Sequence, residues 1–179
     1  MKNAEPELVV HGAQFEDGIG MTRAMLKADF TPEMFFQTNA PSFGSQFTEG
    51  IGEENTEGIF YAVSHSPDAD TPGNAEFVAK YEEMYGEGEV PEDAADAFAA
   101  GEVLQAAVEA VGSIEDQTAL ADWLHENEVE TILGPLSWDE TGAPQGDFLI
   151  GQWREGAPQI VLPEEAATAK VKAAWEPGQ

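Results

Sequence analysis

Residues 7–28, ELVVHGAQFEDGIGMTRAMLKA, decide the fold, because they read as a strand, a short loop and a helix in direct succession. A compact apolar run at 8–10 stops at Gly12, which is typical of a parallel strand covered on both faces. Apolar residues then recur at helical spacing over 17–28, which predicts an amphipathic helix. In an open α/β sheet, the loop between such a strand and helix is where a ligand binds.

The rest of the chain continues this alternation of short apolar runs and longer amphipathic segments. The patterns predict strands at 35–38, 59–63, 131–133, 136–138, 148–153 and 159–162. They predict helices at 42–51, from Thr71 to Gly86, from Val90 to Gly112 with its apolar residues on one face, and after an N-cap at Ser113. From Pro163 onward the composition turns to Ala, Glu, Lys and Pro, which predicts a loosely held tail.

Composition limits the function. Seven Lys and Arg face 35 Asp and Glu, and the net charge of -28 goes with 42% hydrophobic residues, so an acidic folded protein is expected. So negative a surface repels nucleic acid and anionic lipid. We interpret the acids as a solvation coat, as in halophilic proteins that work in brine. The absence of cysteine excludes disulfides, thiolate zinc sites and a cysteine nucleophile.

A partial dinucleotide-binding motif follows the first strand, where Gly18 and Gly20 have the spacing of the first two glycines. The third glycine would fall at Arg23, and residues 16–17 are both acidic, where a pyrophosphate would sit. Like charge at a helix N-terminus opposes phosphate binding. No cofactor is therefore expected.

Catalytic and metal motifs are also lacking. The three histidines, His11, His65 and His125, are scattered without a metal-ligand spacing, and we interpret them as structural. The sequence has neither a hydrolase nucleophile elbow nor a phosphate-binding Gly-Lys loop. No catalytic residue or metal ligand is expected, although an enzyme is not excluded.

A family resemblance supplies what the motifs do not. Residues 131–153, TILGPLSWDETGAPQGDFLIGQW, contain a Gly-Pro, an aromatic residue, an Asp-x-x-Gly turn and a Gln-Trp. In this order they resemble the closing hairpin of the solute-binding proteins of branched-chain amino acid ABC transporters, which have the class I periplasmic-binding fold. Segments 8–25, 56–86, 97–113 and the helix before Thr131 resemble the same family in the same order, so the likeness covers about 8–162.

The resemblance implies a three-layer αβα fold of two lobes joined by three crossovers, of which this chain resembles only the latter half. It implies that 1–62 belong to the C-terminal lobe, 63–145 to the returning part of the N-terminal lobe, and 146–162 to closing strands of the C-terminal lobe, with a tail at 163–179. A missing N-terminal half would carry the signal peptide and any lipid anchor of an extracellular or periplasmic protein. We therefore expect the isolated chain to expose a large apolar face.

The implied function is that of the solute-binding component of an ABC importer. Such a protein binds an amino acid, or a related amide or urea-type solute, in a cleft between its lobes, and closure is read by the permease. The implied partners are the small-molecule ligand, the ABC permease subunits and the missing N-terminal half. Two alternatives are a ligand-sensing regulatory domain of the same fold and a small α/β enzyme with unrecognised chemistry.

The family's ligand positions fall on Gln14, with Phe15 beside it, on Asn39 and on Asp93. The resemblance implies an aromatic residue at the first, an ammonium-binding acid at the Asn39 position and a tyrosine at the last, so all three depart from the leucine-binding pattern. Our hypothesis is that Asp93 takes an amine while Gln14 and Asn39 bond an amide or polar group. The structural alternatives are a solvent-facing loop residue for Gln14, a turn residue for Asn39 and a first-turn helix charge for Asp93.

Overall fold

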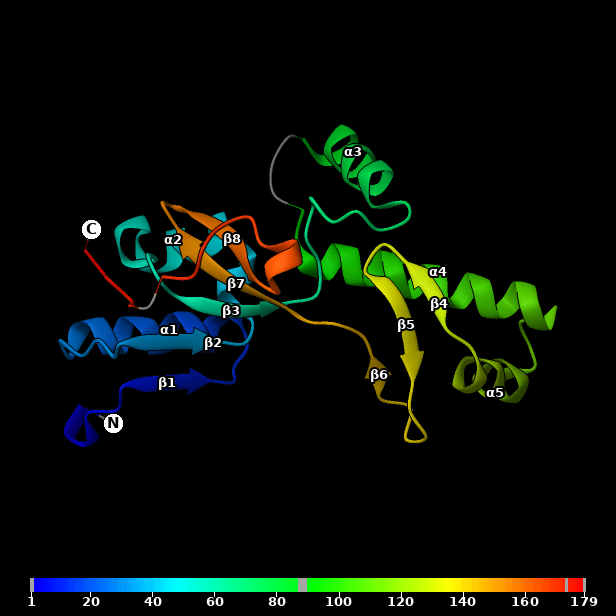
Figure 1. Ribbon diagram of the computed structural model, residues 1–179, viewed down its shortest axis with the longest axis horizontal. Coiled ribbons are helices and arrows are strands. Elements are labelled where there is room, and N and C mark those ends of the chain that lie inside the picture. Colours follow the sequence, from blue (N-terminus) through cyan, green and yellow to red (C-terminus); the bar gives the residue numbers. More distant parts are fainter. Residues whose placement is uncertain (1, 87–89, 173, 179) are drawn as a thin grey trace. The chain divides into compact units, whose positions relative to one another are not determined.

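The computed structural model describes residues 2–86, 90–172 and 174–178. The chain divides into two compact units, Met1–Val63 with Phe148–Gln179, and Ser64–Asp147. Each unit combines strands with helices, so the α/β class expected from the sequence is confirmed (Figure 1).

The first unit is built on a sheet with the order β1-β2-β3-β7-β8. Its strands are β1 (Leu8–His11), β2 (Met34–Gln37), β3 (Phe60–Val63), β7 (Leu149–Arg154) and β8 (Ala157–Leu162). The first three are parallel, with Val9 opposite Phe35, while β7 pairs antiparallel with β3 and β8 pairs antiparallel with β7. The carboxyl ends of β1 and β2 therefore meet at one edge of the sheet.

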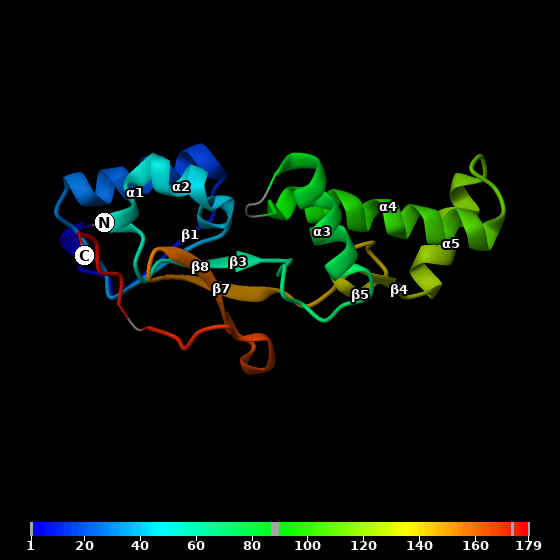
Figure 2. The ribbon, with the colours of Figure 1, turned by 90° about the horizontal axis from the view of Figure 1, so that it is seen from above.

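Helices α1 (Phe15–Lys27) and α2 (Ser45–Ile51) lie on one side of this sheet (Figure 2). Short 3₁₀ turns complete the unit: η1 (Lys2–Ala4), η2 (Ala40–Phe43), η3 (Glu53–Asn55) and η4 (Glu164–Ala166). Beneath the helices a core forms from side chains that alternate along the strands and from the apolar stripes of both helices, among them Val9, Met25, Phe35, Phe47, Tyr61 and Trp153. Helix α1 begins two residues earlier than the sequence pattern predicts.

The other side of the sheet is open along β1, so the expectation of a strand covered on both faces is wrong. Leu8 is 51% exposed, Val10 64% and Met34 39%, whereas Val9 between them is buried. Side chains alternate between faces along a strand, and α1 packs on only one of those faces. An apolar run marks the strand but does not reveal what covers it.

The prediction of a loosely held tail is also wrong. Trp175 is 3% exposed, its ring lies 5.0 Å from that of Phe35, and its Nε1 donates to the Asn55 carbonyl at 2.8 Å. Gly58 has a positive φ of 89°, and its missing Cβ leaves room for the Ala174 carbonyl. Most residues after Pro163 are Ala, Glu, Lys or Pro, but one aromatic residue of this segment, Trp175, packs into the core.

The described residues of the second unit form three helices and a three-stranded antiparallel sheet. Its elements are α3 (Asn74–Tyr85), α4 (Glu92–Val111), α5 (Gln117–Glu126), β4 (Val129–Thr131), β5 (Gly134–Trp138) and β6 (Pro144–Gln145). Ala95 and Ala99 of α4 pack with Ile132 in a small core. The predicted ends of α3 and α4 at Gly86 and Gly112 are confirmed.

The helix starts differ from the sequence prediction. The Thr71 hydroxyl donates to the Ile132 carbonyl at 2.6 Å, and Gly73 occupies the N-cap position of α3 instead. For α5 the cap is Asp116, whose Oδ1 accepts from the Ala119 amide at 3.1 Å. The Thr71 hydroxyl does not cap the helix because it bonds a residue that is distant in sequence.

Helix α4 does not bury all of its apolar residues on one face, which corrects the sequence prediction. Ala95, Ala99 and Ala107 are buried, but Phe98 is 48% and Leu104 59% exposed. Apolar residues therefore occupy more than one face of α4, a pattern typical of a helix covered on more than one side.

The Asp-x-x-Gly segment of the second unit forms a turn between β5 and β6. Asp139 Oδ1 accepts from the Thr141 hydroxyl at 2.6 Å, the Thr141 amide at 2.8 Å and the Ala143 amide at 3.0 Å. These bonds, with the Thr141 hydroxyl as the largest contribution, lower the pKa of Asp139.

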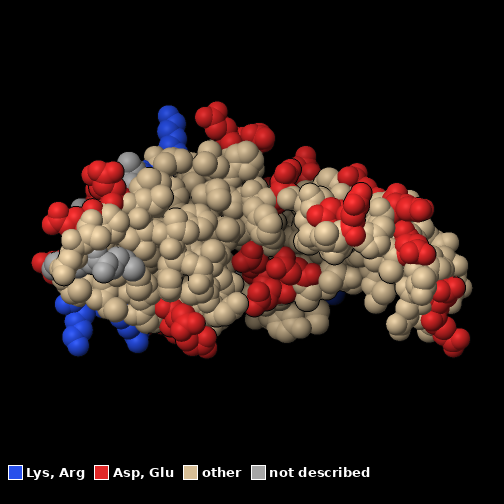
Figure 3. All heavy atoms as spheres, turned by 90° about the horizontal axis from the view of Figure 1, so that it is seen from below, with Lys and Arg blue, Asp and Glu red and all other residues tan. Residues whose placement is uncertain are grey.

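Acidic side chains far outnumber basic ones on the face drawn in Figure 3. Within the described residues, no helix combines the length and the apolar character needed to cross a membrane.

Candidate functional site

The candidate site of the first unit lies at the carboxyl ends of β1 and β2. The Thr38 hydroxyl accepts from the Ala13 amide at 3.1 Å and donates to the Ala13 carbonyl at 3.3 Å. The Thr38 amide also donates to the His11 carbonyl at 3.1 Å. The loop after β1 and the loop after β2 are thus held together by one side chain, at the sheet edge where α/β proteins bind ligands.

Gln14 and Phe15 come from the loop after β1. Gln14 is exposed and occupies the N-cap position of α1 in extended conformation, but its side chain makes no capping bond. Phe15 is half-buried, with its ring 4.8 Å from that of Phe43. The side-chain amide of Gln14 is therefore available to a ligand. The rings of Phe15 and Phe43 form an apolar patch beside it.

Asn39 follows β2 and is half-buried. Its carbonyl accepts from the Ser42 amide at 3.0 Å and the Ser42 hydroxyl at 2.7 Å, which fixes the turn into η2. Its side-chain Oδ1 is buried and has no hydrogen-bond partner among the described residues. The backbone of Asn39 thus serves the turn, while its side chain keeps a free acceptor.

Gln37, the last residue of β2, was missed by sequence reasoning. It is 1% exposed, and its Nε2 donates to the Thr22 hydroxyl at 2.7 Å and to the Gly18 carbonyl at 3.2 Å. A Cβ at Gly18 would lie 2.7 Å from Gln37 Oε1 and overlap Ala40. Close packing against the strand end therefore accounts for the first glycine of the partial dinucleotide motif. A glutamine ending an otherwise apolar strand was the available signal.

Three buried polar atoms lack partners within the described part of the chain: His11 Nδ1, Gln37 Oε1 and Asn39 Oδ1. Their residues all lie at the carboxyl ends of β1 and β2, where His11 is the register partner of Gln37. An unpartnered buried polar atom costs about 1–3 kcal/mol, so each calls for an explanation. All three atoms are buried to the same degree, so each is a candidate for a hydrogen bond from a ligand or an ordered water.

Asp93 belongs to the second unit and lies exposed in the first turn of α4. The preceding Glu92 is fixed, because its Oε1 accepts from the Ser64 amide at 2.7 Å and the Ser64 hydroxyl at 3.0 Å. Gln14, Phe15 and Asn39 are thus grouped in the first unit, and Asp93 is held on a well-anchored helix start in the second. Among the described residues, no group of three or more His, Asp or Glu side chains could hold a metal ion.

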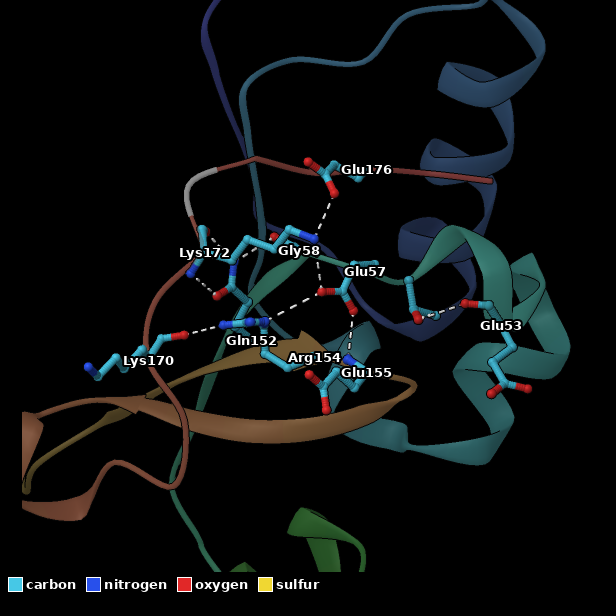
Figure 4. Close-up of polar contacts among 10 residues, drawn as sticks. Glu53, Glu57, Gly58, Gln152, Arg154, Glu155, Lys170, Lys172 and Glu176 are labelled. Carbon is cyan, nitrogen blue, oxygen red and sulfur yellow. Dashed lines mark hydrogen bonds and ion pairs between the residues drawn. The ribbon is translucent and has the colours of Figure 1, made fainter. Parts of the chain in front are cut away.

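A second polar cluster in the first unit surrounds Glu57, which sequence reasoning also missed (Figure 4). Glu57 Oε1 lies 3.1 Å from Lys172 Nζ and 3.4 Å from Arg154 Nε, and its Oε2 accepts from the Glu155 amide at 2.7 Å. Partial burial raises the pKa of Glu57, but the Glu155 amide, Lys172 and Arg154 together outweigh it and leave that pKa below its ordinary value. The only sequence signal for this cluster was the small number of Lys and Arg residues in the chain.

Comparison with known proteins places the chain in a family. Residues 1–158 match the periplasmic binding protein family. A Leu/Ile/Val-binding protein homolog of Brucella melitensis is 40% identical over 62 residues, which are 34% of this chain and 17% of that protein.

Two solved structures share the fold. A leucine-binding protein of Thermotoga maritima has a TM-score of 0.71 at 21% identity, over 87% of this chain and 43% of that one. A branched-chain amino acid transporter substrate-binding protein of Streptococcus pneumoniae, in complex with isoleucine, has a TM-score of 0.68 at 16% identity, over 88% of this chain and 45% of that one. The chain therefore spans less than half the length of these relatives, and the periplasmic-binding fold expected from the sequence is confirmed. On the extent of the family match, the chain belongs to the periplasmic binding protein family.

Proposed function

We propose that this chain is part of the extracytoplasmic solute-binding component of an ABC importer, which binds an amino acid or a related small polar solute and delivers it to a membrane permease. The observation that carries the proposal is the pair of strand-end loops joined by Thr38, with the free amide of Gln14 and the unpartnered Oδ1 of Asn39. Membership of a binding-protein family supports binding without chemistry. Relatives named for leucine, isoleucine and valine support an amino acid as the ligand.

The four predicted residues have distinct proposed roles. Asn39 and Gln14 hydrogen-bond a polar group of the solute, and Phe15 packs against its apolar part. Asp93 pairs with an ammonium group, because a carboxylate is the natural partner of an amine in a site that excludes water. Asn39 is neutral, so it supplies hydrogen bonds but no charge.

The test compares leucine with 4-methylpentanoate, which has the same carbon skeleton without the amino group. Thermal unfolding of the chain is followed in concentrated KCl with each compound, with isoleucine and with glutamine. A ligand at 100 times its Kd stabilises the folded state by about 2.7 kcal/mol, which raises Tm by about 5–10 °C for a chain of this length. We expect such a rise for at least one amino acid and none for 4-methylpentanoate.

Asp93→Asn tests the ammonium contact, with Glu109→Gln as the control because Glu109 is an exposed acid on the same helix. We expect the amino acid's effect on Tm to fall strongly in Asp93→Asn and to persist in Glu109→Gln. An unchanged effect in Asp93→Asn would remove the role of this carboxylate. If none of the amino acids raised Tm, solute binding by this chain would be the wrong conclusion.

We further propose that a polypeptide equivalent to the N-terminal half of the relatives covers the apolar surfaces left open in each unit. In the first unit these are the exposed residues of β1 and β2, Leu8, Val10 and Met34. In the second, a groove of about 670 Å³ between α3 and α4 is lined by aromatic side chains, including Phe77, Tyr81, Tyr85 and Phe98. Apolar surface of this extent is typical of a binding interface, and the chain spans under half the length of its solved relatives.

A further inference from the structure

We propose that the C-terminal residues 168–172 and 174–178 form a strap that is locked onto the first unit by the carboxylate of Glu57 and released when that charge is removed. The proposal concerns the described residues of this segment and is independent of the ligand-binding role. Figure 4 shows Glu57 between Lys172 of the strap and Arg154 of β7.

The strap is attached at its two ends by backbone contacts. At one end, the Thr168 amide donates to the Ile160 carbonyl at 2.8 Å. At the other, Trp175 is buried in the core, and the Glu176 amide donates to the Glu57 carbonyl at 3.0 Å. Among its described residues the strap forms no helix or strand, so side-chain contacts between these points decide whether its middle stays in place.

The middle of the strap depends on Gln152 and on the charges around Glu57. Gln152 Nε2 donates to the Lys172 carbonyl at 2.6 Å, while its Oε1 accepts from the Lys172 amide at 2.8 Å. Arg154 donates to the Lys170 carbonyl and to Glu57, so it binds the strap and the carboxylate at once. The Glu57 side chain is only 16% exposed, and its contacts are therefore less screened than those of a surface pair.

The placement of the chain's few cations supports a special role for this cluster. Only seven cations serve 35 acids, yet two of them, Arg154 and Lys172, pair with the same carboxylate. The charged residues around Glu57 come from η3, from β7 with its following turn, and from the strap: Glu53, Glu54, Arg154, Glu155, Lys172 and Glu176. The Lys170 ammonium points away from Glu57. If Glu57 were neutral, Lys172 and Arg154 would lose the carboxylate that joins them, and Glu176 would be left as the strap's own partner for Lys172.

The direction of the pH dependence follows from the contacts. Because the pKa of Glu57 in the folded chain is lowered, its contribution is fully present above the ordinary value of 4.5 and is lost as pH falls through the lower folded value. The pKa of Lys172 is raised, chiefly by its hydrogen bond to Glu176, so its contribution is lost only as pH rises past 10.5. The strap is therefore locked between these limits and opens in acid.

Trypsin provides the test, because Lys170 and Lys172 are cleavage sites within the strap. Glu57→Gln mimics the protonated carboxylate, and Glu53→Gln is the matched control, since the exposed Glu53 carboxylate lines the same pocket without bonding the strap. Mass spectrometry compares cleavage after Lys170 with cleavage after Arg23 in α1. We expect Glu57→Gln to accelerate cleavage after Lys170 about tenfold or more, with Arg23 and the control unaffected.

Equal acceleration at Lys170 and Arg23 would mean that the first unit unfolds as a whole, and the proposal would be overturned. No acceleration at either site would overturn it as well. A second measurement avoids any variant of Glu57: the wild-type chain carries ¹⁹F-labelled tryptophan, and Trp175→Phe assigns the signal. The Trp175 signal must change in acid before that of Trp153, a buried tryptophan of the same core. A simultaneous change of both signals contradicts an independent strap.

Discussion

Gly18 helps to position the candidate site because it has no side chain. It lies in α1, one turn after the loop that carries Gln14, and its carbonyl accepts from both Gln37 Nε2 and the Thr22 hydroxyl. The helix can approach the end of β2 this closely only because position 18 has no Cβ. Gly18 and Gln37 thereby fix the start of α1, and with it the direction in which the loop after β1 leaves the sheet.

Gly18→Ala and Gly20→Ala form a matched pair that tests this role. Replacing a helical glycine by alanine gains about 0.5–1 kcal/mol in helix propensity, and Gly20 has nothing within 4 Å of an added Cβ. At Gly18 the same Cβ would overlap Ala40 and crowd Gln37, and such overpacking costs about 1–3 kcal/mol. Urea unfolding should therefore show a stabilised Gly20→Ala and a destabilised Gly18→Ala. Equal stability of the two variants would contradict the packing argument.

At the scale of elements, β1 has one buried and one open face. Val9 is 6% exposed and contributes to the core, while its neighbours Leu8 and Val10 are more than half exposed. Strand β1 is also the end strand of its sheet in the described structure, so the open face continues to an unpaired edge. Soluble proteins normally protect such edges, which makes this surface the clearest candidate for contact with a further polypeptide.

The open face predicts that substitutions on the exposed side of β1 reduce dye binding, whereas a substitution on its buried side reduces stability. Nile red is the appropriate probe, because it is uncharged and is not repelled by an acidic surface. The double variant Leu8→Ser, Val10→Ser should lose much of the wild-type dye fluorescence while keeping its stability within about 0.5 kcal/mol. Val9→Ser should instead destabilise the chain by about 2 kcal/mol or more, because it places a hydroxyl in the core. A native monomer that binds no dye would contradict the open face.

The sequence predicted elements well wherever the signal is local. Apolar runs marked β1, β2 and β3, and glycines marked the ends of α3 and α4, because these signals act within one turn or one strand. The same local patterns placed loops after β1 and β2, whereas the choice of Gln14 and Asn39 within them came from the family resemblance, and their role in binding stays a prediction. The cluster of Glu57 with Lys172 could not be foreseen, since its members lie 115 positions apart. Nor could the open face of β1, because an apolar pattern does not identify what packs against it.

At the scale of the whole molecule, the net charge of -28 is the dominant property. With Arg154 and Lys172 paired with Glu57, five of the seven cations remain to balance the acids elsewhere in the chain. Mutual repulsion of the acids favours the expanded unfolded chain over the folded one, and dissolved ions screen that repulsion. The strap contacts are short and partly buried, so added salt weakens them less than it weakens repulsion across the surface.

We therefore expect urea unfolding midpoints to rise between about 0.1 M and 1 M KCl, over which the screening length falls from about 10 Å to about 3 Å. The triple variant Asp122→Asn, Glu126→Gln, Glu128→Gln removes three exposed acids of the second unit. It should be more stable than wild type at low salt and respond less to KCl, because less repulsion remains to be screened. Circular dichroism during urea titration measures both effects. Parallel salt responses of the variant and the wild type would mean that the salt acts through hydration of apolar surface, since only the charge term differs between the two chains.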